Sequence, residues 1–240
     1  MKVLLSGHGR MGTRIEELAI QAGHEVVGYA DITNPHILSQ MPKADVVIDF
    51  SHPAMLPHLT EYVHRTGTAL CCGTTGFQSE DKDTLKSLGD YAPVLYSANY
   101  SLGIAVFRQI LQQISPILKE DFDIEIVETH HNKKVDAPSG TAKLLLDAID
   151  PNHQNTIING RNGECGERQK QEIGVFALRG GTVAGAHTVY YFGEDEVLSI
   201  THSATSRQIF AKGALKAATA LVQKNRGFYT LDQILFTDTK

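Results

Sequence analysis

Between residues 3 and 100, short apolar runs alternate with longer segments in which apolar and polar positions recur at helical spacing. Apolar runs bounded by glycine, proline or polar residues are typical of buried strands. Strands that alternate with amphipathic helices predict a parallel sheet with helices on both faces. The predicted strands are Val3–Ser6, Val26–Ala30, Val46–Phe50, Ala69–Cys72 and Val94–Ser97.

Helix signals fill the gaps between these strands. Between the first two strands the apolar residues have the spacing of one helix face, and Gly23 follows where a helix would end. Pro53 and Gly67 bracket the next predicted helix, and Ser79, followed by acidic residues, is predicted to cap a third. The first hundred residues therefore contain a βαβ unit that is extended by further strands and helices.

The pattern changes in the next hundred residues. One long helix is predicted over 102–118 and a strand over 124–127, and three further strands are separated by a Gly-Gly pair at 180–181 and by residues 193–196. Both separators are typical of hairpin turns, so we expect an antiparallel, one-layer sheet whose apolar face is covered by a helix or a partner subunit. The three strands are Ile173–Leu178, Val183–Phe192 and Val197–Ser203.

Two remaining segments complete the chain. Residues 149–172 are rich in asparagine, glycine and charge, and we interpret them as a long mobile loop. Residues 208–223 carry apolar side chains at helical spacing and are predicted to form a helix that packs back on the first sheet.

Composition narrows the class of protein. The chain has 240 residues and a formal net charge of -5, which argues against a nucleic-acid-binding surface, since such domains are usually basic. No apolar run approaches the ~20 residues that cross a bilayer, and the N-terminus lacks the apolar stretch of a secretory signal. The three cysteines follow neither disulfide nor zinc spacing. We therefore expect a cytoplasmic protein with reduced, structural cysteines and no nucleic-acid or membrane partner.

A glycine-rich sequence directly follows the first predicted strand and opens the first helix. In this context a GxGxxG motif predicts dinucleotide binding, because glycines allow the tight turn, the close approach of a pyrophosphate and the contact of helix with strand. The helix N-terminus adds N–H donors and partial positive charge. The alternative is an ordinary glycine-rich turn. The six residues are Gly7, His8, Gly9, Arg10, Met11 and Gly12.

Other candidate cofactor contacts follow the remaining strands. Asp31 comes near the position of the acid that binds an adenosine ribose, which favours NAD over NADP. A 2′-phosphate could still meet Arg10 or His8, so NADH and NADPH both stay candidates. Loops at the carboxyl ends of strands are where open α/β sheets bind ligands. Those loops supply Ser51, Gly73, Thr75, Ala98 and Asn99.

The segment 128–142 concentrates histidines, lysines, acids and a Pro-Ser-Gly-Thr turn. A buried strand would reject most of these side chains, because an unpaired polar group taken out of water costs on the order of several kcal/mol. We interpret the segment as a ligand-binding loop in which Asp136 bonds backbone within its turn. Adjacent histidines point in different directions and no zinc-binding spacing accompanies them, so no metal is expected.

These motifs resemble the dihydrodipicolinate reductase family of the lysine and diaminopimelate pathway. The resemblance runs along the whole chain. Its most specific block is HHNKKVDAPSGTA at 130–142, and it also covers GHGRMG at 7–12, DFSHP at 49–53, GTTGF at 73–77, RGG at 179–181, GAHT at 185–188 and TSR at 205–207.

The resemblance and the patterns together imply an α/β fold with two domains. Residues 1–100 and 208–240 form a Rossmann-like dinucleotide-binding domain. Residues 101–207 form an α+β substrate-binding and tetramerisation domain with a mixed or antiparallel open sheet. The family is usually a homotetramer, and closure of the domains is expected to bring the nicotinamide to the loop at 130–141.

The resemblance also implies the chemistry. A cyclic dicarboxylate, 4-hydroxy-tetrahydrodipicolinate, is reduced to tetrahydrodipicolinate by NADH, NADPH or both, without a metal. Hydride adds to one end of a conjugated system and a proton to the other. His130 donates the proton by resemblance, and Lys134 binds a carboxylate; whether Lys134 also shares in proton delivery is left open, so both are assigned as catalytic. The remaining implied substrate contacts are His131, Ser139, Gly140 and Thr141, which precede or open a predicted helix at 141–149.

Two other classes of protein share part of this pattern. A different Rossmann-type dehydrogenase of amino acids or sugars would keep GxGxxG and a lysine-bearing second domain, yet it would not need the block at 130–142. A nucleotide-sensing regulator would bind NAD without turnover and would lack the acid and the cationic clamp. The presence of both groups in this sequence favours the reductase.

Overall fold

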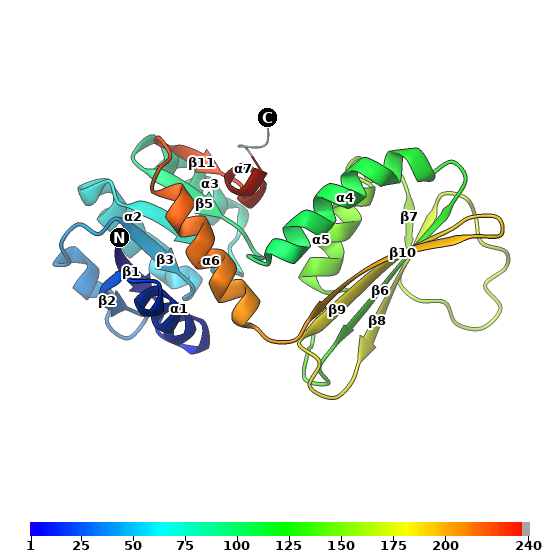
Figure 1. Ribbon diagram of the computed structural model, residues 1–240, viewed down its shortest axis with the longest axis horizontal. Helices are drawn as coiled ribbons and strands as arrows, with labels where there is room; N and C mark the ends of the chain where they lie inside the picture. The colour runs from blue at the N-terminus through cyan, green and yellow to red at the C-terminus, as the bar shows by residue number, and fades with distance from the viewer. Residues whose placement is uncertain (237–240) are drawn as a thin grey trace. The chain divides into compact units, whose positions relative to one another are not determined.

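The computed structural model describes residues 1–236, which divide into two compact units (Figure 1). Of the described residues, the first unit contains 1–101 and 208–236, and the second contains Leu102–Arg207. Each unit buries an apolar cluster of its own. Within residues 1–236, no helix is long and apolar enough to cross a membrane.

The first unit is built on a six-stranded parallel sheet in the order β11-β5-β4-β3-β1-β2. Its central strands are buried along their whole length, which is the expected state of a parallel sheet covered on both faces. The strands are β1 (Lys2–Ser6), β2 (Glu25–Ala30), β3 (Val46–Asp49), β4 (Ala69–Cys72), β5 (Pro93–Tyr96) and β11 (Gly227–Tyr229).

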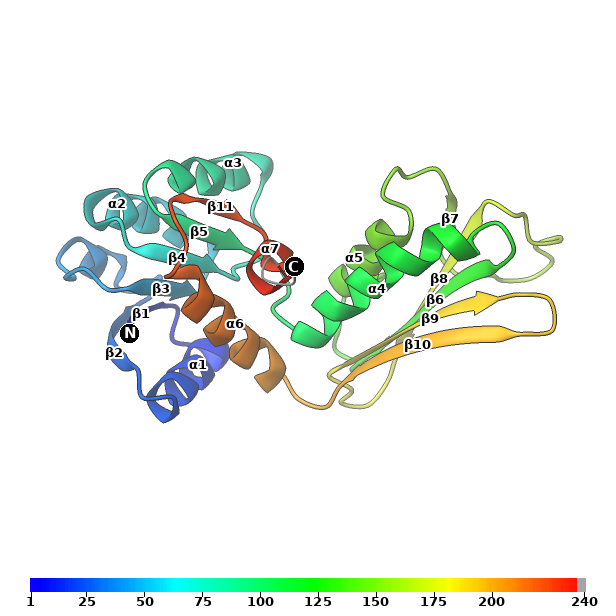
Figure 2. The same ribbon diagram turned by 45° about the horizontal axis from the view of Figure 1, so that its top comes forward.

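Helices cover both faces of this sheet (Figure 2). Helices α1 (Arg10–Gln21) and α6 (Gln208–Leu221) pack against one another and against the sheet, and the alanines on the buried side of α6 allow that close approach. Helices α2 (Leu56–Thr66) and α3 (Ser79–Ser87) contribute to the cluster on the other face. Short elements complete the unit: η1 (Pro35–Ser39), η2 (Pro53–Met55), η3 (Leu88–Asp90) and α7 (Leu231–Phe236).

The predictions for the first unit agree closely with this arrangement. The five predicted strands are confirmed to within one residue at each end, and the predicted helix at 208–223 packs on the first sheet. Gly67 ends α2 with a φ of 65°, a conformation that glycine adopts at little cost. The predicted cap of α3 is wrong by one residue. Gln78 is the N-cap, because its side chain and that of Asp81 form a reciprocal capping box.

The second unit is a five-stranded sheet in the order β10-β9-β6-β8-β7, with helices α4 (Leu102–Leu118) and α5 (Gly140–Ile149) packed together on one face. Along β6, Ile124 and Ile126 join the cluster beneath these helices, while Glu125 lies on the opposite face. The strands are β6 (Asp123–His130), β7 (Thr156–Ile158), β8 (Glu172–Arg179), β9 (Gly185–Phe192) and β10 (Val197–Ala204).

The second sheet is mixed, which confirms the predicted fold class, although the turn signals alone indicated antiparallel pairing throughout. Strand β6 pairs parallel with β8 and antiparallel with β9, so β6 lies between two strands that follow each other in the chain. The Gly-Gly pair at 180–181 is therefore not a hairpin turn. Residues 193–196 do form one, since the Gly193 N–H donates to the Glu196 carbonyl at 2.9 Å between antiparallel β9 and β10.

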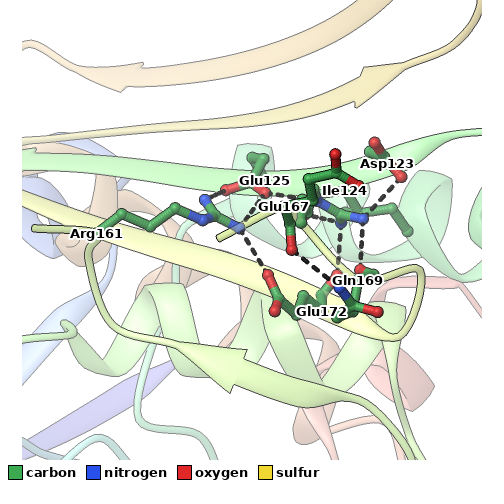
Figure 3. A network of polar contacts seen from close by, with 8 residues as sticks. Asp123, Ile124, Glu125, Arg161, Glu167, Gln169 and Glu172 are labelled. Carbon is green, nitrogen blue, oxygen red and sulfur yellow. Dashed lines mark hydrogen bonds and ion pairs between the residues drawn. The ribbon is translucent and has the colours of Figure 1, made fainter. Parts of the chain in front are cut away.

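The segment 149–172 is also more ordered than the loop that its composition predicts. Strand β7 pairs with β8, and two arginines bind the carboxylate of Glu125, which is only 9% exposed (Figure 3). Arg161 makes two contacts with Glu125, at 2.9 and 3.0 Å, and Arg168 makes one at 3.1 Å. The high charge of the segment indicated a loop, because composition does not show which charges are paired. In the structure, each of the two guanidinium groups binds a carboxylate on the sheet.

Candidate active site

The carboxyl ends of the strands in the first unit bring most of the predicted cofactor contacts to one edge. Ser6, Asp49 and Cys72 are in register on β1, β3 and β4. The residues that follow them, among them Gly7, Ser51 and Gly73, therefore leave the sheet along the same edge. Strand β1 lies between β2 and β3, so the edge beside it is a topological switch point, where open α/β sheets bind ligands.

The three glycines of the GxGxxG motif meet different demands. A Cβ on Gly7 would lie 2.5 Å from the Phe50 carbonyl oxygen, and one on Gly12 would lie 2.0 Å from the Gly7 carbonyl oxygen. Packing of the protein itself thus requires both. A Cβ on Gly9 would meet no atom within 4 Å. Gly9 is also the N-cap of α1 and has no side chain to bond the first helical N–H groups, so this position leaves space and donors for a phosphate.

The other residues of this first loop take separate positions. Arg10 is exposed and Met11 is half-buried at the start of α1. The imidazole of His8 stacks on Tyr29, and its Nε2 lies 2.7 Å from a carboxylate oxygen of Glu16. His8 is therefore already partnered by an acid, which disfavours its binding a 2′-phosphate.

Asp31 follows β2 at the same edge. Its Oδ1 accepts hydrogen bonds from the hydroxyl and the backbone N–H of Thr33, at 2.6 and 2.8 Å. These bonds lower the pKa of Asp31, so the group is a fixed carboxylate at neutral pH. An ionised acid here can accept from ribose hydroxyls and repels a 2′-phosphate.

The contacts predicted after β3, β4 and β5 differ in exposure. The Ser51 hydroxyl donates to buried Asp49 at 2.5 Å, and its backbone N–H donates to the Thr74 hydroxyl at 2.8 Å. Gly73 is buried, and a Cβ there would lie 2.4 Å from the Phe50 ring. The exposed or half-exposed members of the set are Thr75, Ala98 and Asn99.

The cysteines bear out part of the structural role expected of them. Cys71 and Cys72 are free and buried in β4, and burial raises the pKa of Cys71 to about 12. Cys165 is free as well, but it is exposed, so the structural role predicted for it is wrong. Among residues 1–236, no cluster of three or more histidine, cysteine or acidic side chains is arranged to hold a metal ion.

In the second unit, the interpretation of 128–142 as a loop throughout is wrong at its beginning. Glu128 and His130 belong to β6, where Glu128 is fully buried and His130 is 9% exposed. They lie two residues apart and so share one face of the sheet. A buried strand accepts these side chains because each one is paired.

The carboxylate of Glu128 is the centre of these pairs. Arg179, at the end of β8, donates two parallel hydrogen bonds to it, at 2.8 and 2.9 Å. The Nδ1 of His130 lies 2.5 Å from Oε2, and the backbone N–H of Ser139 donates to Oε1 at 3.1 Å. Burial opposes the charge on Glu128, but the bonds from Arg179 and His130 outweigh it and lower the pKa of Glu128.

The same cluster holds the N-terminus of α5, which begins at Gly140, one residue before the predicted start. The hydroxyl of Ser139 accepts from the N–H of Ala142 and lies 3.1 Å from the Nε2 of His187 on β9. Because Ser139 is 1% exposed, its hydroxyl serves first as a helix cap. A Cβ on Gly140 would meet no atom within 4 Å, so this positive helix end is open to close approach by an anion. Thr141 follows in the first turn.

His187 is a neutral neighbour of His130. The two rings meet edge to face with their centres 5.1 Å apart. Burial, reinforced by the nearby charge of His130, lowers the pKa of His187 to about 4. Its Nδ1 has no hydrogen-bond partner within the described part of the chain, so a second proton on this ring would be left unsatisfied.

Lys134 and His131 lie in the loop that follows β6. The ammonium of Lys134 is 2.7 Å from the Asp136 carboxylate, and this contact accompanies the backbone bond expected for Asp136. The Nε2 of His131 is 3.5 Å from a guanidinium nitrogen of Arg207. Partial burial and then the charge of Arg207 lower the pKa of His131, which leaves this ring neutral near pH 7.

Sequence reasoning thus missed three residues that shape the site. Glu128 was visible as the acid two positions before His130 on the same strand face. Arg179 and His187 stand in the blocks at 179–181 and 185–188, at the end of β8 and near the start of β9. Their pairing with Glu128 depends on strand order, which no local pattern revealed.

Chemically, the second unit offers a histidine held by an anion, a lysine, and an open helix N-terminus on one connected stretch. This set can bind a carboxylate and donate a proton beside it. The first unit offers a glycine turn, a helix N-terminus and an ionised acid in the arrangement that suits a dinucleotide.

Comparison with known proteins agrees with the sites described in both units. The family described as dihydrodipicolinate reductase, N-terminus, matches residues 1–100, and the one described as dihydrodipicolinate reductase, C-terminus, matches residues 103–235. The 4-hydroxy-tetrahydrodipicolinate reductases of Staphylococcus aureus (strain JH9) and of Staphylococcus saprophyticus are each 43% identical over 244 residues, covering 98% of this chain and 100% of the relative.

Solved structures share the fold. Dipicolinate-bound dihydrodipicolinate reductase from Paenisporosarcina sp. TG-14 has a TM-score of 0.79 at 22% identity, covering 98% of this chain and 99% of the other. An amine dehydrogenase from Mycobacterium smegmatis is similar at a TM-score of 0.59 and 11% identity, with 97% and 95% covered. Both likenesses concern the fold alone.

Proposed function

This chain belongs to the dihydrodipicolinate reductase family, and we propose that the groups described above carry its reaction. It is an NAD(P)H-dependent oxidoreductase that reduces 4-hydroxy-tetrahydrodipicolinate to tetrahydrodipicolinate in lysine biosynthesis. In balance, the substrate gains one hydride and one proton and loses its hydroxyl group as water. The observation that carries our assignment of residues is the buried His130, held by Glu128 beside the N-terminus of α5.

The protein's part in this balance is to bind the dicarboxylate and to supply the proton. His130 is the proton donor in our proposal, because Glu128 holds its Nδ1 and orients the ring beside the N-terminus of α5. When bound, the reduced nicotinamide supplies the hydride. The residues proposed to hold that cofactor are Gly7, His8, Gly9, Arg10, Met11, Gly12, Asp31, Ser51, Gly73, Thr75, Ala98 and Asn99.

Lys134 is proposed to bind one substrate carboxylate. Its ion pair with Asp136 does not prevent this, since Asp136 has a half-exposed side chain and an exposed pair of this kind is worth only about 0–1 kcal/mol. A substrate carboxylate can therefore replace Asp136 as the partner. His131, Gly140 and Thr141 are proposed as further contacts, and Ser139 as the residue that caps and places the helix end.

We further propose a preference for NADH over NADPH, with both accepted. The ionised Asp31 supports the preference, because it would repel a 2′-phosphate, and exposed Arg10 supports some tolerance of that phosphate. The enzyme is expected in the cytoplasm.

Assembly into a homotetramer is proposed through the face of the second sheet that α4 and α5 leave open. Large apolar side chains are exposed on this sheet, namely Leu178 (54%), Phe192 (41%) and Val197 (58%). Exposed apolar area of this kind is common at subunit interfaces. Light scattering of the purified chain measures the assembly, and a monomer at assay concentrations would contradict it.

The function is tested by coupling the purified chain to the preceding synthase, fed with pyruvate and aspartate semialdehyde. Loss of reduced-nicotinamide absorbance is followed with NADH and NADPH separately. We expect synthase-dependent oxidation with both, faster at low concentration with NADH. No oxidation by folded protein that still binds the nucleotide would refute the function.

Two substitutions test the assigned residues in the same assay. His130→Gln should lower kcat by about 100-fold with little change in KM, since a general acid contributes about 10²–10⁴-fold to the rate. Lys134→Ala should raise KM as well. Lys133→Ala is the matched control, because Lys133 is an exposed neighbour in the same loop. Unchanged kinetic constants in Lys134→Ala would refute its role in binding.

A further inference from the structure

Glu128 is a fully buried acid that the proposed reaction does not use directly. Taking a carboxylate out of water is costly unless cations and hydrogen bonds compensate it. Arg179, His130 and the N–H of Ser139 together supply four contacts to its two oxygens. The chain therefore maintains an ionised group within the sheet, in direct hydrogen-bond contact with the proposed acid.

The geometry determines which nitrogen of His130 carries a permanent proton. An ionised carboxylate can only accept hydrogen bonds, so the Nδ1 that lies 2.5 Å from Oε2 must be the donor. The proton that leaves the ring is then the one on Nε2. This nitrogen lies 3.0 Å from where a Cβ on Gly185 would stand, so glycine at that position keeps the donating end of the ring uncrowded.

Cations around Glu128 offset the negative charge that this residue presents to His130. Arg179 neutralises Glu128 through two hydrogen bonds, so the group of Glu128, Arg179 and His130 carries one positive charge before proton transfer and none afterwards. From β9, His187 meets the ring edge to face and is neutral, and the cations of Lys134 and Arg207 lie on the loops beyond.

We propose that Glu128, held in place by Arg179, is a positioning residue that fixes the tautomer and orientation of His130 and sets the pH range in which His130 donates its proton. This proposal rests on the proposed role of His130 as the acid. It assigns Glu128 no contact with substrate or cofactor; Glu128 acts through the ring it holds.

The alternative is that Glu128 and Arg179 only fasten β6, β8 and the loop before α5 together. Glu125 provides the matched control. It is also a buried acid on β6, also bound to arginine, but it lies on the opposite face of the sheet from His130. A purely structural role would make the two acids alike in their effect on the rate profile.

The test compares pH profiles of kcat in the coupled assay for Glu128→Gln, Arg179→Gln and Glu125→Gln. In Glu128→Gln we expect kcat to fall about 10-fold or more with KM nearly unchanged, and the alkaline limb to move to lower pH by about one unit, because the protonated ring has lost its anion. In Arg179→Gln the limb should move to higher pH. Glu125→Gln should keep the wild-type profile. Opposite shifts cannot come from loosening of the fold alone.

A second measurement needs no folded variant at Glu128. Side-chain ¹⁵N shifts of histidine in the wild-type protein at alkaline pH, with the His130 signals assigned by their absence in His130→Gln, should show a protonated Nδ1 and an unprotonated Nε2. The opposite tautomer, or an unchanged limb in folded Glu128→Gln, would overturn the positioning role. Full activity of His130→Gln would instead overturn the proposed function, so the two failures are distinguishable.

Discussion

The network around Glu125 allows a test of what orders the segment between α5 and β8. The perturbation is Glu125→Gln, which keeps the size of the side chain and removes its charge. The carboxylate is 9% exposed and accepts three bonds from two guanidinium groups, at 2.9, 3.0 and 3.1 Å (Figure 3). In the variant, the amide NH₂ of glutamine would face at least one guanidinium N–H. Both groups are donors, so that hydrogen bond would be lost.

The magnitude follows from the exposure of the partners. A hydrogen bond to a charged group contributes about 1.5–3 kcal/mol when buried, whereas an exposed ion pair contributes about 0–1 kcal/mol. The side chains of Arg161 and Arg168 are 29% and 19% exposed, so each contact lies between these limits. Loss of one bond and weakening of two should lower the free energy of unfolding by about 2 kcal/mol.

Urea unfolding followed by circular dichroism measures this change. With a slope of about 2 kcal/mol per M, the midpoint should fall by about 1 M. Trypsin should also cut faster after Arg161 and Arg168, since the segment that carries them loses its anchor. Glu194→Gln is the control, because this acid is exposed in the turn between β9 and β10. An unchanged midpoint together with unchanged cleavage would refute the assigned role of Glu125.

Two further predictions concern the other unit and the effect of pH. Gly9→Ala should fold normally yet weaken nucleotide binding about 10-fold in a fluorescence titration, because the added Cβ would occupy space that the protein itself leaves empty for a ligand. Gly12→Ala should instead lower the urea midpoint, since its Cβ would lie 2.0 Å from a carbonyl oxygen. Equal nucleotide affinity in Gly9→Ala would contradict the pyrophosphate site. The pKa of His187 is lowered from 6.5 to about 4 on folding, so the unfolded chain takes up this proton first as pH falls, and up to about 3 kcal/mol of stability should be lost between pH ~6.5 and ~4. His187→Gln should lose less stability over that window in urea titrations at each pH, and an identical pH dependence would contradict the assignment.

Local patterns in the sequence were sufficient for five of the six strands of the first unit, and β11 was not predicted. Strand boundaries there follow from apolar runs, since a parallel sheet covered on both faces buries every residue of its central strands. The position of the GxGxxG motif predicted a tight turn that opens a helix, and the structure has the turn at Gly7 and the helix from Arg10. Both features depend on residues that are close in the chain.

The tertiary structure alone decided the surroundings of His130. Composition indicated that a buried strand would not accommodate an acid and a histidine. Strand β6 accommodates them because Arg179 at the end of β8 and the N–H of Ser139 before α5 donate to the acid. Arg179 is 51 residues from Glu128 in the chain, and it reaches that carboxylate only because β6 lies between β8 and β9. Strand order is a property of the whole sheet, so the sequence by itself predicted which side chains would do the chemistry, and only the fold determined which groups hold them.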